Sequence, residues 1–407
     1  MPNLAGMWTL VGQAEAKGQN IWPATPSAPT IGTATATGSS TATVAFTAPS
    51  YAGVPATITG YTATSSPSGF TGTSATSPIT VTGLSSSTSY TFTVTATNAT
   101  GIGPASSASN SITTSAVTTQ KAIFGYGFTV TPSAAYSSVT NLVSNTGVVA
   151  TDTTGVGTAR LQLAAAGYGT DKAIFGYGES SSGKVSMTNL VSNTGVVASD
   201  TTGVGTARNG VAAAGYGGDK AIFGYGFTTG VQSMTNLVSN TGAVSTDTTG
   251  VGTARTQLAA AGYGSDKAIF GYGSAGADRS MTNLVSNTGV VATDTTGVGT
   301  ARFDLAATGY GGDKAIFGFG YGSGFISITN LVSNTGVVAA NTTGVGTARY
   351  GLAAAGYGSD KAIFGYGNSG SRTSITNKVS NTGVVATDTA GVGNARDGLA
   401  AAGYSST

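Results

Sequence analysis

The sequence KAIFGYG at residues 172–178 decides how this chain is organised. The same string occurs six times, once with Phe in place of its Tyr, and the copies begin at Lys121, Lys172, Lys220, Lys267, Lys314 and Lys361. Each copy belongs to a longer repeat that ends in an arginine. These arginines are 47 or 48 residues apart, at Arg160, Arg208, Arg255, Arg302, Arg349 and Arg396. A period of this size indicates an array of repeated structural units.

The composition indicates an all-β surface protein. Only 8 % of the 407 residues are charged, the net charge is +2 and 64 residues are glycine. Despite this bias, β-branched and aromatic residues recur in register, which is not typical of disordered chains. The length is sufficient for several domains, each with its own core.

The chain contains no Cys and no His. Disulfides, thiolate chemistry, imidazole bases and the commonest zinc and haem ligands are therefore excluded, and we expect neither a metal nor a cofactor. No apolar run approaches the roughly 18 residues that cross a bilayer, so we expect no membrane insertion. The short apolar patch near the N-terminus lacks a preceding basic region, which argues against a secretory signal.

Residues 1–23 differ from the rest of the chain and hold its two tryptophans, Trp8 and Trp22. Exposed Trp is costly in a soluble protein and is enriched at interface centres, so we predict a docking segment. The alternative is a tail that packs on the next domain.

Residues 24–115 alternate between apolar and polar in short runs separated by Gly, Ser and Pro, which predicts a sandwich of about seven strands. The segment resembles a fibronectin type III domain. The residues that carry the resemblance are Pro26, Pro29, Phe46 in place of the family's usual Trp, Pro49, Gly53, Gly60, Tyr61, Leu84, Tyr90, Phe92, Val94, Ala96, Asn98, Gly101, Gly103 and Pro104. The resemblance implies that Tyr90 is a buried core tyrosine.

The same segment has no charged residue, so we expect an uncharged spacer. Residues 116–120 form a linker to the repeats.

Each repeat divides into four strand candidates, at residues 163–169, 172–178, 186–192 and 196–202 in the second copy. A tight Asn193-Thr194-Gly195 turn joins the last two. Four strands in about 47 residues is typical of a propeller blade. We therefore expect residues 121–407 to form a six-bladed β-propeller.

The repeat resembles a Kelch blade. Arg208 fits the blade junction, VAAAGYG the first strand and KAIFGYG the second, in which Tyr225 separates Gly224 from Gly226. The family's blade Trp and its usual His are missing, so the resemblance implies the architecture and no partner.

The array begins with a second strand at Lys121 and ends with a first strand at residues 399–404. Pairing of these two strands would complete six blades and leave no open edge.

The charges of the array mostly recur in every repeat. A residue placed identically in each copy is expected to bond turn backbones or the neighbouring copy. The alternative is a ring of six arginines around a channel mouth that binds an anion.

The copies differ mainly in the connection between the second and third strands and in the two residues after each arginine. In an antiparallel meander both places lie on one face, where we predict ligand binding. The candidate residues, aromatic or charged, are Phe128, Tyr136, Glu179, Lys184, Phe227, Asp278, Arg279, Phe303, Asp304, Tyr321, Phe325, Tyr350, Arg372 and Asp397. Such residues suit stacking on sugar rings or contact with a protein surface. Drift of unselected loops is the alternative.

Catalysis has weak support, because no asymmetric set of nucleophile and base is visible. Carboxylate pairs for glycoside hydrolysis are conceivable from Glu179, Asp278, Asp304 and Asp397. The near-zero net charge argues against nucleic acid.

The assembly resembles fibre or decoration proteins of tailed phages. We therefore expect a non-enzymatic adhesin on the virion surface, docked to other virion proteins through residues 1–23 and bound to a host glycan or protein. The alternatives are a purely structural capsid or tail decoration and a glycan-cleaving enzyme. A homo-oligomer is left open.

Overall fold

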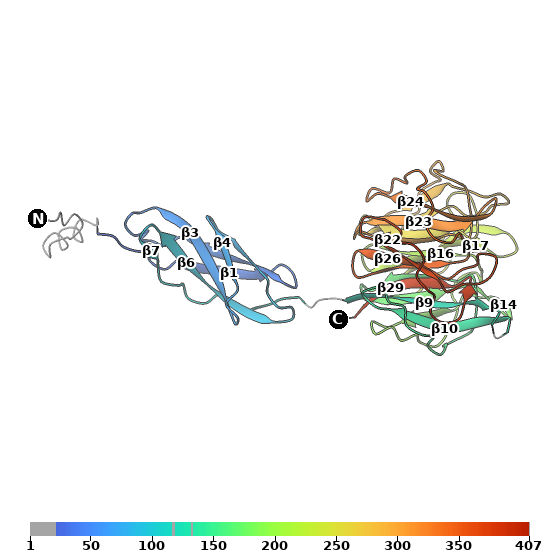
Figure 1. Ribbon diagram of the computed structural model, residues 1–407, viewed down its shortest axis with the longest axis horizontal. Helices are drawn as coiled ribbons and strands as arrows, with labels where there is room; N and C mark the ends of the chain where they lie inside the picture. Colours follow the sequence, from blue (N-terminus) through green and yellow to red (C-terminus); the bar gives the residue numbers. More distant parts are fainter. Residues whose placement is uncertain (1–21, 116–118, 132, 407) are drawn as a thin grey trace, which may run out of the picture. The chain divides into compact units, whose positions relative to one another are not determined.

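The computed structural model describes residues 22–115, 119–131 and 133–406, and all of the regular elements in these segments are β-strands (Figure 1). The chain divides into two compact units, Met1–Val117 and Thr118–Thr407. An all-β fold is confirmed.

The first unit contains two antiparallel sheets. One has the strand order β1 (Thr30–Ala36), β2 (Thr41–Thr47), β5 (Ile79–Thr82). The other has the order β4 (Thr71–Ser74), β3 (Ile58–Ser66), β6 (Ser89–Asn98), β7 (Gly101–Ile102), and β8 (Ile112–Thr113) also pairs with β6.

The alternation in β6 buries every second side chain. Tyr90 is 1 % exposed, and its hydroxyl accepts a hydrogen bond of 3.0 Å from the Ser85 amide. The polar end of this tyrosine is thus satisfied inside an apolar core.

In its described residues, the second unit contains six small sheets, one for each repeat, in which an Ala-rich inner strand, a KAIFG middle strand and an outer strand lie side by side, and a separate two-stranded sheet of β13 (Glu179–Ser180) and β14 (Gly183–Lys184). The six sheets, each given as inner, middle and outer strand, are β29 (Ala400–Ser406), β9 (Thr119–Thr129), β10 (Ala135–Val143); β11 (Ala164–Tyr168), β12 (Lys172–Gly176), β15 (Thr188–Val191); β16 (Ala212–Tyr216), β17 (Lys220–Phe227), β18 (Val231–Val238); β19 (Ala259–Tyr263), β20 (Lys267–Gly271), β21 (Thr282–Val285); β22 (Ala306–Tyr310), β23 (Lys314–Tyr321), β24 (Phe325–Val332); and β25 (Ala353–Tyr357), β26 (Lys361–Gly365), β27 (Thr376–Val379).

The first of these sheets joins the two ends of the array. Strand β29 pairs with β9 from Ala400 opposite Gly125 to Ser406 opposite Thr119. The short strand β28 (Arg396–Asp397) pairs with the far end of β9. The strand expected at residues 399–404 is therefore found beside the first KAIFGYG copy.

The inner strands contact one another in an order that returns to its start. Strand β11 contacts β16, and the order continues through β19, β22, β25 and β29 back to β11. Each sheet itself stays open. Only small residues fit between neighbouring inner strands, because a Cβ added to Gly167 would lie 3.2 Å from the carbonyl oxygen of Gly403.

Adjacent sheets pack through aromatic residues of the middle strands. The ring of Phe223 packs against Gly176 of the preceding sheet, where an added Cβ would lie 2.7 Å from Phe223 Cζ. The ring centroids of Tyr177 and Phe223 are 5.1 Å apart. The invariant Phe and Gly of KAIFGYG are thus matched across each junction.

The prediction of a fourth strand in each repeat, at residues 196–202 in the second copy, is wrong. This segment makes only two isolated bridges, Val197 to Val191 and Thr201 to Thr188. Between them, the side-chain amide of Asn189 donates to the carbonyl oxygen of Ala198 at 3.0 Å. A side chain thus replaces a rung of the backbone ladder, and a continuous strand cannot form.

The six repeated arginines join neighbouring sheets. Arg208 is 0 % exposed. Its Nε donates to the carbonyl oxygen of Tyr225 at 2.7 Å, and its Nη2 donates to Asn236 Oδ1 at 2.6 Å. The guanidinium carbon lies 4.4 Å from the ring centroid of Tyr177, and Nη1 lies 3.7 Å from Asp247. Because all six side chains are fully buried among protein partners, the alternative of an anion-binding arginine ring is wrong.

Candidate ligand-binding face

The residues that differ between repeats lie together in six short rows. In each row, the first residue after the arginine pairs with the residue that follows the KAIFGYG string, which pairs in turn with the start of the outer segment. The rows are Leu161, Glu179, Lys184; Asn209, Phe227, Val231; Thr256, Ser274, Asp278; Phe303, Tyr321, Phe325; Tyr350, Asn368, Arg372; and Asp397, Phe128, Tyr136. We call these residues the variable face.

Four of the predicted aromatic residues form one cluster across two rows. Tyr321 lies between the rings of Phe303, Phe325 and Tyr350, with centroid distances of 5.7, 5.6 and 5.6 Å. Phe325 and Tyr350 are parallel within 4° at 5.9 Å. Phe325 is 43 % exposed, so part of this cluster is available to a ligand.

A charged group adjoins the cluster. Arg372 Nε is 2.7 Å from Asp397 Oδ1, and its guanidinium carbon lies 4.8 Å from the ring centroid of Phe128. Phe128 in turn contacts Tyr136 edge-on at 5.6 Å. Arg372 is therefore held by both an ion pair and a cation–π contact.

Of the remaining charged candidates, Glu179 and Lys184 lie in another row, and the Asp278 carboxylate approaches Gly322, which follows Tyr321 of the cluster. Lys184 Nζ is 5.2 Å from the ring centroid of Phe227, and Glu179 accepts a hydrogen bond from Asn209. Asp278 and Arg279 lie in the loop before β21, where Arg279 donates its backbone amide to Gly273 at 2.8 Å. Of the four carboxylates proposed for glycoside hydrolysis, Asp304 and Asp397 lie near each other, since the charge of Asp397 raises the pKa of Asp304, whereas Glu179 lies in another row.

The second residue after each arginine forms a closed cycle of backbone hydrogen bonds, a feature not expected from the sequence. Each amide donates to the carbonyl oxygen of its counterpart in the preceding repeat at 2.7 to 2.9 Å. In the direction of donation the cycle is Gly210, Gln162, Gly398, Gly351, Asp304, Gln257 and back to Gly210. All six residues have positive φ, between 49° and 63°.

The cycle surrounds a cavity of about 70 Å3, the axial pocket. The cycle contributes Gln162, Gln257, Asp304 and three glycines to its lining, and five leucines and one valine that follow them in the chain make up the rest. Of these three polar residues, only Asp304 is among the ligand-binding residues predicted from the sequence. The sequence signal for Gln162 and Gln257 is that this position of the repeat holds either Gly or a polar residue, as expected where φ must be positive.

Asp304 is the most perturbed carboxylate of this pocket. Gln257 Nε2 donates to its Oδ2 at 2.8 Å. Burial raises the pKa of Asp304 to about 7, the negative charge of Asp397 adds to the rise, and the hydrogen bond from Gln257 opposes it. Around neutral pH this carboxyl is therefore partly protonated.

Replacement of Asp304 by Asn should remove a pH dependence of stability. A carboxyl whose pKa rises on folding, here from 3.8 to about 7, stabilises the fold below the lower value, and that contribution is lost as the pH rises through the higher one. The wild type should lose at most roughly 4 kcal/mol over this range, reduced by solvent screening of a partly exposed group. Thermal melts from about pH 4 to pH 8 should flatten in the variant. Parallel profiles would contradict the assignment.

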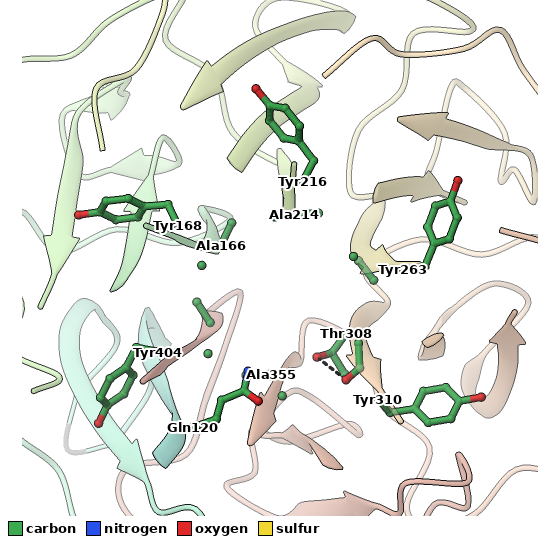
Figure 2. A pocket seen from close by; sticks show the side chains of 18 of the residues that line it. Gln120, Ala166, Tyr168, Ala214, Tyr216, Tyr263, Thr308, Tyr310, Ala355 and Tyr404 are labelled. Carbon is green, nitrogen blue, oxygen red and sulfur yellow. Dashed lines mark hydrogen bonds between the residues drawn. The ribbon is translucent and has the colours of Figure 1, made fainter. Parts of the chain in front are cut away.

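A second cavity of about 330 Å3 lies at the other end of the inner strands, which we call the invariant end. Figure 2 shows the rings of Tyr168, Tyr216 and Tyr263 directed away from its centre, while Gln120 and Thr308 border the central space. Lysines at its rim pair with the preceding aspartates, as in Lys172 to Asp171 (2.8 Å) and four equivalent pairs. Small side chains and paired charges give this cavity no evident chemistry.

The predicted docking segment falls mostly outside the described residues, and Trp8 with it. Trp22 lies at the start of the described chain and is partly buried. Docking through residues 1–23 therefore stays a prediction. In the described segments, no group of three or more metal-ligating side chains is suited to hold a metal ion. The same segments contain no helix long and apolar enough to cross a membrane.

Comparison with known proteins identifies part of the first unit. The family model of the fibronectin type III domain matches residues 27–112. The resemblance predicted for this segment is therefore confirmed, and the chain carries such a domain before its repeats. The match ends before the repeats begin. No curated protein matches the chain.

Proposed function

We propose that the repeats form a six-bladed β-propeller that serves as a non-enzymatic binding module on a virion surface. The observation that carries the binding role is the register of the six rows, which gathers the residues that differ between repeats onto one face. Loops on a rigid scaffold commonly carry binding residues.

Two cyclic features support the propeller. The inner strands contact one another in an order that returns to β11, and the backbone hydrogen bonds around the axial pocket form a six-membered cycle. A closed ring of blades leaves few exposed strand edges, which favours solubility in a chain with few charges. A Kelch-like arrangement is compatible with the repeat, although three regular strands replace four.

The direction of β9 supports a role in presentation. This strand begins at Thr119, at the invariant end, and runs to Phe128 and Thr129 on the variable face. The chain therefore enters the unit at the end opposite the variable residues. We propose that residues 1–23 dock to other virion proteins, that the uncharged fibronectin type III domain is a spacer, and that the variable face binds a host glycan or protein.

The combined replacement of Phe303, Tyr321 and Tyr350 by Ala tests the binding role. We expect adsorption of the labelled full-length protein to bacterial cells to be abolished, because the aromatic cluster would lose three of its four rings. Adsorption would be measured by co-sedimentation, with a triple variant at exposed valines of the invariant end, Val196, Val290 and Val337, as control. Both variants should keep most of the wild-type melting temperature.

Unchanged adsorption of the aromatic variant would exclude this cluster as the receptor site. Stable attachment to virions without any cell binding would favour a decoration protein. Release of sugar from cell envelopes would favour a glycan-cleaving enzyme.

A further inference from the structure

The cycle around the axial pocket is symmetric in its backbone and asymmetric in its side chains. Gln162, Gln257 and Asp304 have φ values of 52°, 54° and 49°, in the left-handed region that glycine occupies most readily. A non-glycine residue here costs on the order of 1 kcal/mol. Such residues are found at ligand clamps and other functional sites. Three of six equivalent positions therefore keep a polar side chain despite this cost.

The glycines of the cycle open the pocket beside the aromatic cluster. Gly351 follows Tyr350 directly, and Gly398 follows Asp397. Both glycines and Asp304 line the same cavity of about 70 Å3. Since a liquid water occupies roughly 30 Å3, this space admits a hydroxyl or hydroxymethyl group and excludes a whole sugar ring. A ligand that uses it must lie mostly outside, on the neighbouring surface.

That neighbouring surface is aromatic. Tyr350 contacts Tyr321 at 5.6 Å and is parallel to the partly exposed Phe325. Burial raises the pKa of the Tyr350 hydroxyl, and the negative charges of Asp397 and Asp304 raise it further. The Tyr350 ring therefore lies near both carboxylates. Tyr350 therefore connects an apolar platform with hydrogen-bonding groups. The C–H faces of a sugar ring suit the platform, and its hydroxyls suit the polar groups.

The charges of the surface argue for a neutral ligand. Asp278, Asp304 and Asp397 are acidic, and Arg372 is already engaged by Asp397 at 2.7 Å. Arg279 lies next to Asp278 in the chain, and its Nε is buried without a hydrogen-bond partner. Beside the axial pocket, a carboxylated or phosphorylated glycan would meet the carboxyl groups of Asp304 and Asp397, which is unfavourable.

We propose that the variable face binds a neutral hexose of a surface glycan, with the sugar ring stacked on Tyr350 and one hydroxyl-bearing group in the axial pocket beside Gln257 and Asp304. This assignment rests on the proposed binding function and specifies its ligand class. Gln257 and Asp304 would form hydrogen bonds with the sugar hydroxyls, since an amide and a protonated carboxyl can each donate and accept.

The test adds bulk to a lining residue of the pocket, Gly351, where an added Cβ would lie 3.3 Å from Asp397 Cβ and from the Gly398 amide nitrogen, and leaves the residues of the aromatic cluster unchanged. Gly351→Asn adds a side chain at a positive-φ position that Asn tolerates. Its matched control is Gly218→Asn at the invariant end, where φ is also positive and no atom lies within 4 Å of an added Cβ. Binding of methyl glucoside, galactoside, mannoside and N-acetylglucosaminide to the full-length protein would be measured by saturation-transfer NMR, with glucuronate and N-acetylneuraminate as anionic probes.

We expect at least one neutral hexoside to bind with millimolar affinity, Gly351→Asn to weaken it by about tenfold or more, and Gly218→Asn to leave it unchanged. A second variant, Gln257→Gly with Asp304→Gly, keeps the backbone conformation and should weaken binding similarly. Binding of anionic sugars alone, or hexoside binding that resists both pocket variants, would overturn the assignment. Cell adsorption without binding of any sugar would also overturn it, yet leave the proposed binding function standing. Absence of cell adsorption would instead refute the binding function.

Discussion

A chain that ends at Gly398 should lose more than about 5 kcal/mol of unfolding free energy, which is comparable to the whole stability of many domains. The deletion removes β29, whose Ala400, Ala402 and Tyr404 are buried in the core shared by the first two sheets. It also exposes the inner edge of β9 and removes a packing neighbour of β11. Loss of apolar burial and a new strand edge both favour unfolding or aggregation.

Thermal and urea unfolding of the soluble fraction would measure this effect. A chain that lacks only residues 405–407 is the control, because it keeps the pairs from Ala400 to Tyr404 with β9. We expect the control to melt close to the full-length protein. Equal melting of both truncated chains would refute the cyclic arrangement of the repeats.

Replacement of Arg255 by Ala should cost about 3–5 kcal/mol, because it removes a large, fully buried side chain together with its hydrogen bonds. Arg255 is 0 % exposed, donates to Asn283 Oδ1 at 2.6 Å and lies 3.7 Å from Asp294. Its guanidinium carbon is also 4.5 Å from the ring centroid of Tyr225 in the preceding sheet. The substitution would leave the buried Asn283 oxygen without this donor and loosen the contact between two sheets.

We expect the melting temperature of the variant to fall by on the order of 10 °C. Lys267→Ala is the matched control, since Lys267 carries the same charge and pairs with Asp266 at 2.8 Å, but its side chain is 44 % exposed. Exposed pairs contribute little, so this control should melt like the wild type. If the two variants melted alike, the arginines would not be the joints between sheets.

Much of the fold could be predicted from the sequence because its determinants are local. The alternation of residues 89–98 specifies a strand with one buried face, and β6 has that pattern. The recurrence of KAIFGYG specifies equal units, since the same seven residues meet the same neighbours in each repeat. The fourth strand was mispredicted because a side-chain bond, from Asn189 to Ala198, competes with the backbone ladder that the pattern indicates.

The candidate site was predictable only in part. Phe303, Tyr321 and Tyr350 could be predicted as ligand-binding residues, because differences between repeats can be read from the sequence without knowledge of tertiary contacts. Gln257 passed unnoticed, since its importance comes from a positive φ and a hydrogen bond to Asp304, a residue of the next repeat. The sequence likewise did not decide whether the six arginines are buried, because charges that recur in every repeat suit either a structural contact between sheets or an anion-binding site.

The sequence by itself determined an all-β chain with an uncharged fibronectin type III domain and six near-identical repeats, because composition, alternation and period are properties of neighbouring residues. Only the tertiary structure decided which residues of different repeats meet. Arg396 donates to Asn141, 255 residues away, and Gln162 donates its amide to Gly398. Such contacts depend on how successive sheets turn around one another until the last reaches the first. That rotation is set by packing of Phe, Gly and Arg across every junction, and no single repeat encodes it alone.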